Sequence, residues 1–208
     1  MTYLVDKLIV ITGCLFALGG TPASNLPLPP INPRLEEIIA LGEQLEEPYI
    51  VIYKYTSTLY FVDQHEIKEY EIATGMASGK KNKSGDFKTP EGTYSICDKH
   101  PSDRFRKFLE INYPNEKDAK NALEQRRISR REYESIIQNL KKGKCPSPNT
   151  YLGGVIGIHG PKKLTLFGEE FSLATLFNWT RGCIATDEEG IDQLYQQTPL
   201  KTTVIIKD

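Results

Sequence analysis

Two short segments hold residue types that can carry out nucleophilic catalysis. His159 ends an apolar run, and Cys183 follows Gly182 in a turn further along the chain. A cysteine nucleophile needs a base within hydrogen-bond reach and surroundings that favour thiolate over thiol. His159 is the natural base, and a hydrogen bond from its second ring nitrogen to a backbone carbonyl would orient the ring. The sequence therefore indicates a cysteine–histidine pair.

We expect the surroundings of Cys183 to lower the pKa of its thiol. Thr186, with Glu189 three residues later, has the pattern of a capping box and predicts a helix N-terminus near the cysteine. The positive end of the helix dipole favours an anion, and Arg181 adds a positive charge. Gly182 permits a tight turn and the close approach of a substrate backbone. The alternative is that the cysteine is a buried structural thiol and the histidine a satisfied core residue.

The overall composition excludes some classes of partner. The 208-residue chain has 26 Lys and Arg against 27 Asp and Glu, a formal net charge of -1. Nothing in this balance suggests nucleic acid or an anionic membrane surface as a partner. Beyond the N-terminus, no apolar run is long enough to span a bilayer. We expect one globular domain with a real core, acting as a monomer without a nucleic-acid partner.

The N-terminal residues have the order of a secretory signal. Lys7 precedes an apolar stretch, residues 8–18, and small and proline-containing residues follow up to Ala23. We predict a signal peptide over 1–23, although a buried strand or helix is an alternative. Residues 11–14 also resemble a bacterial lipobox, in which case the signal ends before Cys14, and the lipidated Cys14 anchors the protein to the membrane. Either signal places the mature protein in the periplasm or cell envelope.

Export makes the remaining cysteines informative. Once Cys14 and Cys183 are set aside, Cys97 and Cys145 are left. In an oxidising compartment such a pair can form a disulfide. Two unpaired buried thiols are the alternative, because the sequence does not show whether the two Cα atoms lie close enough.

Periodicity predicts the elements that position these residues. A linker and a helix over 24–47 precede a domain over 48–208, whose strands outnumber its helices. The predicted strands are 49–55, 58–63, 66–74, 93–97, 107–113, 152–159 and 202–206, and the predicted helices after the first are 115–127, 129–140 and a last one from 186 that Pro199 ends. Ser129 with Glu132 forms a capping box, and Gly143 ends the inserted helical segment. We expect that segment to pack on the sheet, with a lid over the cleft as the alternative.

Polar loops contain the other candidate residues. Lys80, Lys81 and Lys83 lie in one basic loop, which is either solvated or able to meet an anionic substrate; we expect the solvated loop. His65 in a hairpin turn and His100 before a proline are assigned no catalytic role.

Several separated motifs resemble the L,D-transpeptidase (YkuD-like) catalytic domain family. They are Ile158-His159-Gly160, Thr180-Arg181-Gly182-Cys183-Ile184, the turn Gly85-Asp86-Phe87-Lys88-Thr89-Pro90-Glu91-Gly92-Thr93-Tyr94, and Ile111-Asn112-Tyr113-Pro114. The resemblance runs from about Tyr49 to the C-terminus and matches an Asn-Trp-Thr-x-Gly-Cys-Ile-Ala variant. It implies an α+β fold that is mostly β, with an inserted helical segment and an N-terminal helix.

The resemblance also implies a reaction. Cys183 would attack the carbonyl before a terminal D-amino acid of a peptidoglycan stem peptide, with His159 as base and the Gly160 carbonyl as its orienter. The backbone N–H groups of Gly182 and Cys183 would stabilise the oxyanion. A neighbouring amine would then resolve the acyl-enzyme into a cross-link, in peptidoglycan biosynthesis that organises the cell wall and cell shape. No metal or organic cofactor is needed.

Three other activities remain as alternatives. Water in place of the amine would make the protein an L,D-carboxypeptidase, and a non-catalytic cell-wall-binding module or a peptidase for an unrelated substrate are the others. We expect the substrate to contact Trp179, Thr180, Arg181 and Tyr151.

The sequence departs from the family pattern at two positions. Thr180 stands where serine is commoner and keeps a hydroxyl group. Ala185 stands where the family usually has an arginine, which would hold the site or a substrate carboxylate. Arg181 is a candidate replacement, although its backbone direction differs.

Overall fold

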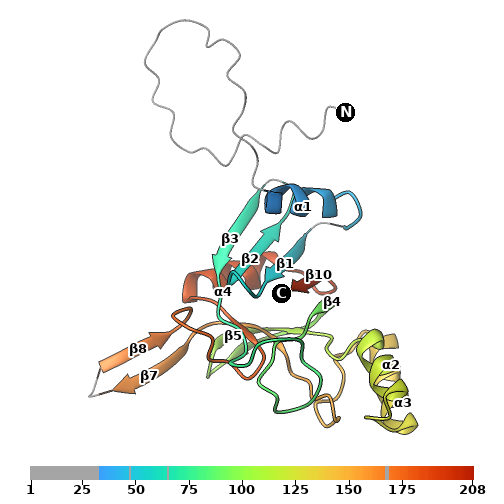
Figure 1. Ribbon diagram of the computed structural model, residues 1–208. Coiled ribbons are helices and arrows are strands. Elements are labelled where there is room, and N and C mark those ends of the chain that lie inside the picture. Colours follow the sequence, from blue (N-terminus) through green and yellow to red (C-terminus); the bar gives the residue numbers. More distant parts are fainter. Residues whose placement is uncertain (1–32, 47, 65, 167–168) are drawn as a thin grey trace, which may run out of the picture.

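One mixed sheet of eight strands dominates the computed structural model (Figure 1), which describes residues 33–46, 48–64, 66–166 and 169–208. The strand order is β3-β2-β1-β10-β4-β5-β6-β9, and β7 and β8 form a separate two-stranded sheet. The predicted α+β class with a β majority is confirmed. The predicted signal over 1–23, Cys14 and the linker up to residue 32 lie outside the described residues. None of the described helices has the length and apolar character that a membrane span requires.

The helices and strands have the following bounds: α1 Pro33–Leu41, β1 Tyr49–Tyr53, β2 Thr58–Val62, β3 Ile67–Glu71, β4 Gly92–Ser102, β5 Arg106–Ile111, α2 Glu116–Glu124, α3 Arg130–Lys141, β6 Gly157–His159, β7 Lys162–Leu166, β8 Glu169–Leu173, β9 Ile184–Ala185, α4 Glu188–Gln197 and β10 Thr203–Lys207.

The main sheet curls until its two edges meet. Ala73, just after β3, exchanges two backbone hydrogen bonds of 2.8 Å with Ala185 in β9. The contact continues backwards along the chain, because the Thr180 N–H donates to the Thr74 carbonyl and the Met76 N–H to the Thr180 carbonyl, each at 3.1 Å. The turn that holds Cys183 is therefore bound along one side by the segment after β3.

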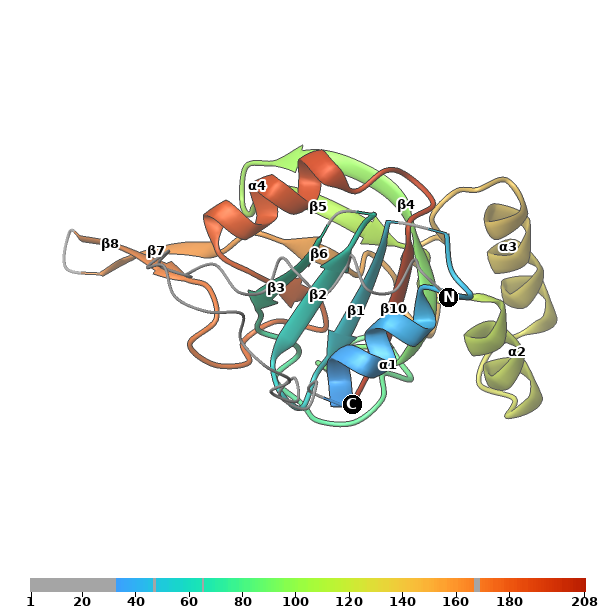
Figure 2. The same cartoon turned by 90° about the horizontal axis from the view of Figure 1, so that it is seen from above.

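Alternation along β1 divides the core into two clusters. All five residues of β1 are buried. Ile50 and Ile52 face the main cluster, whereas Val51 and Tyr53 face a smaller one that also contains Ile38 of α1. Figure 2 shows α1 lying across β1 and β10. The N-terminal helix thus covers one face of the sheet, as a strand buried on both faces requires.

The inserted helices pack on the sheet, as predicted. The Asn115 side chain accepts from the Asp118 N–H to begin α2, and Ser129 begins α3 as expected. Ala119 and Ile136 belong to the main core cluster. Figure 1 shows α2 and α3 side by side at one end of the molecule, while the β7–β8 hairpin extends at the other. Their apolar residues therefore serve packing.

A disulfide closes the insert onto the sheet. Cys97 of β4 is bonded to Cys145, which follows α3, and their Cα atoms lie 5.3 Å apart. Of the two alternatives that the sequence left open, the disulfide is the one found. It crosslinks the base of the helical insert to a central strand.

Several elements differ from the prediction. β4 continues to Ser102, so His100 lies in a strand and not in the polar loop expected before Pro101. The short strand β9 had no predicted counterpart. The strand expected over 152–159 is limited to β6, because Gly153 and Val155 have φ values of +81° and +52° and turn the chain away from an extended ladder. The β7–β8 hairpin was not predicted at all.

Candidate active site

The turn that holds Cys183 requires a glycine before the cysteine. Gly182 has φ +125°, and a Cβ placed there would lie 2.5 Å from the Lys88 carbonyl oxygen. An L side chain would therefore meet both backbone strain and a backbone clash. The side chain of Asn178 steadies the same turn, because its Oδ1 accepts a 2.8 Å hydrogen bond from the Thr74 N–H. Backbone geometry thus fixes where the nucleophile lies.

Thr180 holds the turn together from within. Its hydroxyl donates to the Cys183 carbonyl at 2.7 Å and accepts from the Gly182 N–H at 3.1 Å. The residue is only 3% exposed. Both roles use the hydroxyl group that threonine shares with the commoner serine. This position favours a supporting role for Thr180 over the substrate contact that the sequence predicts.

His159 is held by backbone and by aromatic rings. Its Nδ1 lies 2.6 Å from the Gly160 carbonyl oxygen. A carbonyl can only accept, so Nδ1 carries the proton and Nε2 keeps its lone pair. The ring of Phe105 stacks at 4.2 Å between centroids, and Trp179 meets the imidazole edge-on at 5.7 Å. The orientation predicted from the sequence is present, with a neutral imidazole ready to accept a proton at Nε2.

Two neighbouring strands bring the cysteine to the histidine. His159 of β6 is the parallel partner of Ala185 in β9, so Cys183 directly precedes the strand paired with that of the histidine. The Gly157 N–H of β6 forms a hydrogen bond with the Cys183 thiol. A Cβ on Gly157 would lie 2.4 Å from the Leu109 carbonyl oxygen, so only glycine fits at this position of β6. The thiol itself donates to the Val155 carbonyl at 3.6 Å.

Both members of the pair are uncharged at neutral pH. Burial raises the pKa of the Cys183 thiol to about 11, with a smaller increase from the charge of Glu110, while the Gly157 N–H and Lys81 act in the opposite direction. Burial lowers the pKa of His159 to about 4. The sequence predicted a lowered thiol pKa, and this prediction is wrong because loss of water outweighs the nearby positive groups.

The helix after the cysteine begins one residue later than predicted. Asp187, not Thr186, is the N-cap of α4, and its side chain accepts from the Gly190 N–H. Thr186 instead continues the sheet edge, since its N–H donates to the His159 carbonyl at 3.0 Å and its hydroxyl to the Glu71 carbonyl at 3.0 Å. The Asp187 carboxylate accepts a hydrogen bond from a free N–H at the start of α4 and places a negative charge there. The helix terminus therefore gives the thiol less positive potential than expected.

One lysine of the basic loop is buried. Lys81 is 4% exposed, and its Nζ lies 2.8 Å from the Asp86 carboxylate and 3.0 Å from the Lys83 carbonyl. Lys80 lies 3.6 Å from Asp118. The expectation of a solvated loop is therefore wrong for Lys81, because the turn at Asp86 encloses its ammonium group. Its charge reaches the thiol, where it lowers the pKa of Cys183 against the effect of burial.

The other predicted substrate residues surround the pair unequally. Trp179 contacts the imidazole while its Nε1 donates to the Ala174 carbonyl at 2.9 Å. Arg181 is exposed, with its guanidinium 5.9 Å from the Phe87 ring centroid. Tyr151 is 45% exposed, and its carbonyl accepts from the Ser84 N–H. Only Trp179 touches His159.

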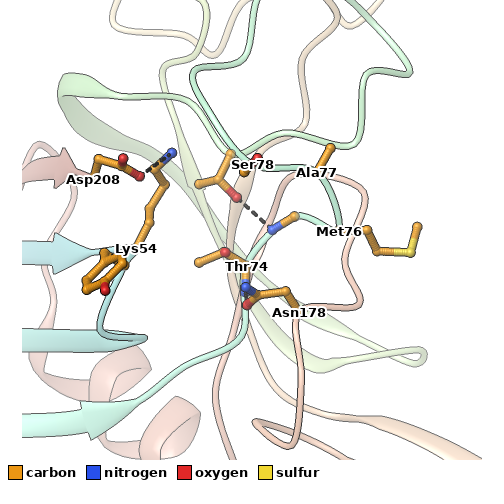
Figure 3. Close-up of a pocket in the computed structure, with 10 residues that line it drawn as sticks. Lys54, Thr74, Met76, Ala77, Ser78, Asn178 and Asp208 are labelled. Carbon is orange, nitrogen blue, oxygen red and sulfur yellow. Dashed lines mark hydrogen bonds and ion pairs between the residues drawn. The ribbon is translucent and has the colours of Figure 1, made fainter.

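A separate polar pocket is lined by residues 74–78 of the segment after β3 (Figure 3). Its volume is about 290 Å³, and neither Cys183 nor His159 lines it. Lys54 at its wall is paired with Glu91 at 2.6 Å and with Asp208 at 3.4 Å. The lysine charge is therefore already neutralised, and the pocket stands apart from the cysteine–histidine pair.

One group of potential metal ligands occurs within the described part of the chain. They are Cys97, Cys145 and Glu110. The two sulfur atoms form the disulfide, so neither offers a thiolate to a metal ion.

Comparison with known protein families identifies the family of the chain. The family model of the L,D-transpeptidase catalytic domain, YkuD, matches residues 47–206. The chain belongs to this family. A search of curated protein sequences found no significant match.

Solved structures are similar at low identity. An L,D-transpeptidase from Mycobacterium smegmatis has 12% identity and a TM-score of 0.44, over 78% of this chain and 59% of its own. The L,D-transpeptidase from Xylanimonas cellulosilytica has 11% identity and a TM-score of 0.45, over 83% and 69%. The helical cell shape determining protein Pgp2 from Campylobacter jejuni has 24% identity and a TM-score of 0.46, over 77% and 47%. The chain thus spans less than two thirds of the length of the first and third of these proteins.

Within the YkuD family pattern, the alanine after Gly-Cys-Ile is explained by its position. Ala185 is fully buried and forms the bridge to Ala73 that joins the sheet edges. A larger side chain would have to displace packed neighbours.

Sequence reasoning missed the rings that hold the histidine. Phe105 and Phe108 both stack on His159, the latter at 5.9 Å and 10° between planes. Phe108 could have been found from pairing, because it is the β5 partner of His159. Phe105 lies in the β4–β5 connection, where no periodicity indicates which ring will turn inwards.

Proposed function

We propose that this protein is an exported L,D-transpeptidase that cross-links peptidoglycan stem peptides through an acyl-enzyme on Cys183. The observation that carries the proposal is the arrangement of His159, whose Nδ1 is bound to the Gly160 carbonyl while its ring is held between aromatic side chains. A histidine fixed in this way presents Nε2 as a base next to the strand that follows the cysteine.

The first half-reaction follows from a neutral thiol and a neutral imidazole. As Cys183 Sγ forms a bond with the carbonyl carbon before the terminal D-amino acid, its proton passes to His159 Nε2. The C–N bond then breaks, and the imidazolium returns that proton to the departing amine. A thioester remains on Cys183. Coupling the proton transfer to the attack removes the need for a preformed thiolate, in agreement with the raised pKa of the thiol.

The Cys183 N–H is the first donor that we assign to the oxyanion formed on the substrate carbonyl. The Gly182 N–H, which the sequence also suggests, donates to Thr180 Oγ1 at 3.1 Å. It contributes to the oxyanion hole only if it gives up that hydrogen bond as charge develops on the substrate. The Thr180 hydroxyl would then orient the turn through the Cys183 carbonyl alone.

The second half-reaction uses the same groups in reverse. An acceptor amine loses a proton to His159 as it attacks the thioester, the C–S bond breaks, and the thiol recovers the proton. Water in place of the amine would give hydrolysis, the L,D-carboxypeptidase reaction, because the same base serves either nucleophile. Export through the predicted N-terminal signal would place the protein where stem peptides occur.

Purified protein incubated with disaccharide tetrapeptide tests the proposal. Wild-type protein is expected to produce cross-linked dimers and to release D-amino acid, whereas Cys183→Ala and His159→Gln produce neither. Release of tripeptide without dimers, at saturating acceptor, would replace transpeptidation by hydrolysis. Peptidoglycan binding without turnover would instead support a non-catalytic module. Circular dichroism and thermal melting of each variant confirm that the loss is chemical.

A further inference from the structure

The pocket of about 290 Å³ beside the segment after β3 has a lining suited to a neutral, polar ligand. The charges of its lining cancel, because the buried Lys54 is paired with Asp208, and Glu91 offers the same lysine a second carboxylate. A charged ligand would lose its water there without gaining a counter-charge. The other polar residues of the lining carry hydroxyl or amide groups: Tyr55, Thr74, Ser78, Thr89 and Asn178.

Several of these groups have no partner in the part of the protein that the structure describes. Thr74 is only 4% exposed, yet its hydroxyl forms no hydrogen bond with a described residue. The Ser78 hydroxyl is equally unpartnered, and Asn178 uses only its Oδ1, which accepts from the Thr74 N–H. Figure 3 shows all three residues at the pocket. A buried polar group without a partner costs free energy, which a ligand that hydrogen-bonds to it recovers.

An exposed aromatic ring belongs to the same lining. Tyr55 lies in the turn between β1 and β2 and is 88% exposed. Its ring contributes little to the core, and the negative face of an aromatic ring attracts the partly positive C–H groups of a pyranose. Met76 and Ala77 add apolar contact of the kind that an acetyl methyl group makes. A stacking surface next to a few hydrogen-bonding groups is the combination that a saccharide requires.

The pocket and the turn that holds the cysteine share one backbone contact. The Thr180 N–H donates to the Thr74 carbonyl, so the two segments lie about 5 Å apart there. Cys183 follows Thr180 by three residues, which span at most about 11 Å. The cysteine is therefore within roughly 16 Å of Thr74. In a tetrapeptide donor, the three residues between the sugar and the attacked carbonyl also span about 11 Å, before their link to the sugar is counted.

We propose that this pocket binds one N-acetylhexosamine ring of the glycan strand that carries the donor peptide. Tyr55 stacks against the sugar ring, and Thr74, Ser78 and Asn178 form hydrogen bonds with its hydroxyl and acetamido groups. The inference rests on the proposed function, which supplies the glycan as the source of the sugar. It adds a recognition site outside the cysteine–histidine pair, so a peptide attached to its disaccharide is bound more tightly than the same peptide alone.

Binding of a neutral sugar without any peptide tests the site independently of catalysis. Wild-type protein labelled with ¹⁵N is titrated with N,N′-diacetylchitobiose, and saturable NMR shifts are expected for the backbone N–H groups of residues 74–78 and for the side-chain amide of Asn178. Thr74→Val should weaken binding about three- to tenfold, as for one neutral hydrogen bond, and Thr74→Ser should restore it. Tyr55→Ala should weaken binding, whereas Tyr55→Phe keeps the ring and should bind normally. Leu200→Ala, at a position that is 56% exposed and outside the pocket, is the control.

Turnover connects the sugar to the reaction. The value of kcat/KM for release of the terminal D-amino acid is measured on the tetrapeptide with and without its disaccharide. Wild type should prefer the disaccharide form by about tenfold, mainly through KM, which corresponds to about 1.4 kcal/mol of binding. In Tyr55→Ala and Thr74→Val the ratio of the two values should fall towards one, and in Leu200→Ala it should stay at the wild-type value.

The possible failures are distinguishable. Absence of saturable shifts in wild type, or binding by Tyr55→Ala and Thr74→Val that equals that of wild type, would overturn the saccharide site even if the tetrapeptide is turned over. Equal weakening in Leu200→Ala would show that the pocket is not where the sugar binds. Sugar binding by folded protein that turns over neither tetrapeptide would refute the proposed function and the glycan as source, and would leave only a saccharide site.

Discussion

Reactivity of the Cys183 thiol as a function of pH is the property on which sequence and structure disagree most clearly. The sequence predicts a lowered pKa, whereas burial in the structure raises the pKa from 9.0 to about 11. Two pH units correspond to roughly a hundredfold less thiolate at neutral pH. A thiolate of higher pKa is intrinsically more nucleophilic, and this offsets part of the loss. We therefore expect Cys183 to react about tenfold more slowly than an unperturbed thiol at pH 7.

Thiol–disulfide exchange with 2-hydroxyethyl disulfide measures this directly. Mass spectrometry of the Cys183-containing peptide gives the rate at that residue alone, from pH 6 to pH 12 within the range where the protein stays folded. The rate should keep rising well beyond pH 9. Glu110→Gln should shift the curve to lower pH, because the carboxylate charge disfavours the thiolate. Glu124→Gln, at an exposed position on α2, is the matched control and should leave it unchanged.

An inflection at or below pH 8.5 in wild-type protein would refute the reasoning. It would mean that the helix terminus and the neighbouring cations lower the pKa of the thiol more than burial raises it. Cys183 would then be a thiolate before substrate binds. A shift of the same size in Glu110→Gln and Glu124→Gln would show that the charge of Glu110 has no particular access to the thiol.

Three further outcomes are expected. Thr180→Val should lower the free energy of unfolding by about 2 to 4 kcal/mol, since two backbone groups of the turn lose their partner; Thr180→Ser should restore it, and denaturant melts that fail to separate the variants would contradict this role. Replacing Cys97 and Cys145 by alanine should cost about 4 kcal/mol in urea unfolding, as expected for the 48-residue separation, whereas an unchanged midpoint would deny the disulfide a stabilising role. His159 binds a proton less readily in the folded protein, with a pKa of about 4 against 6.5. The free energy of unfolding should therefore fall by about 3 kcal/mol as the pH drops from 6.5 to 4. His159→Gln should flatten that part of the stability profile, and an equally steep profile in the variant would show that other groups cause the loss.

Much of the fold could be predicted because local patterns decide it. The alternation around Ile50 and Ile52 and the capping residue Ser129 each specify an element through nearby residues, and the structure has these elements where they were expected. The pairing of β6 with β9, in contrast, depends on contacts between distant segments. Local signals also misplaced the start of α4, because the sheet edge takes Thr186 and leaves the N-cap position to Asp187.

The candidate site was predictable in its residue types but not in its electrostatics. Cys183 and His159 stand out by motif. The need to orient an imidazole predicts a contact with a backbone carbonyl, and the family resemblance identifies that carbonyl as the one of Gly160. Burial of the thiol is a property of the whole fold, which the sequence near Cys183 does not express.

Trapping of the acyl-enzyme tests the central claim most directly. Wild-type protein is mixed with tetrapeptide, quenched with acid at short times and digested, and the peptides are weighed by mass spectrometry. The account predicts a thioester on Cys183 that carries the donor without its terminal D-amino acid, that decays as acceptor is added, and that is absent in Cys183→Ala. Turnover of the tetrapeptide by Cys183→Ala, or an acyl group attached to any other residue, would contradict it.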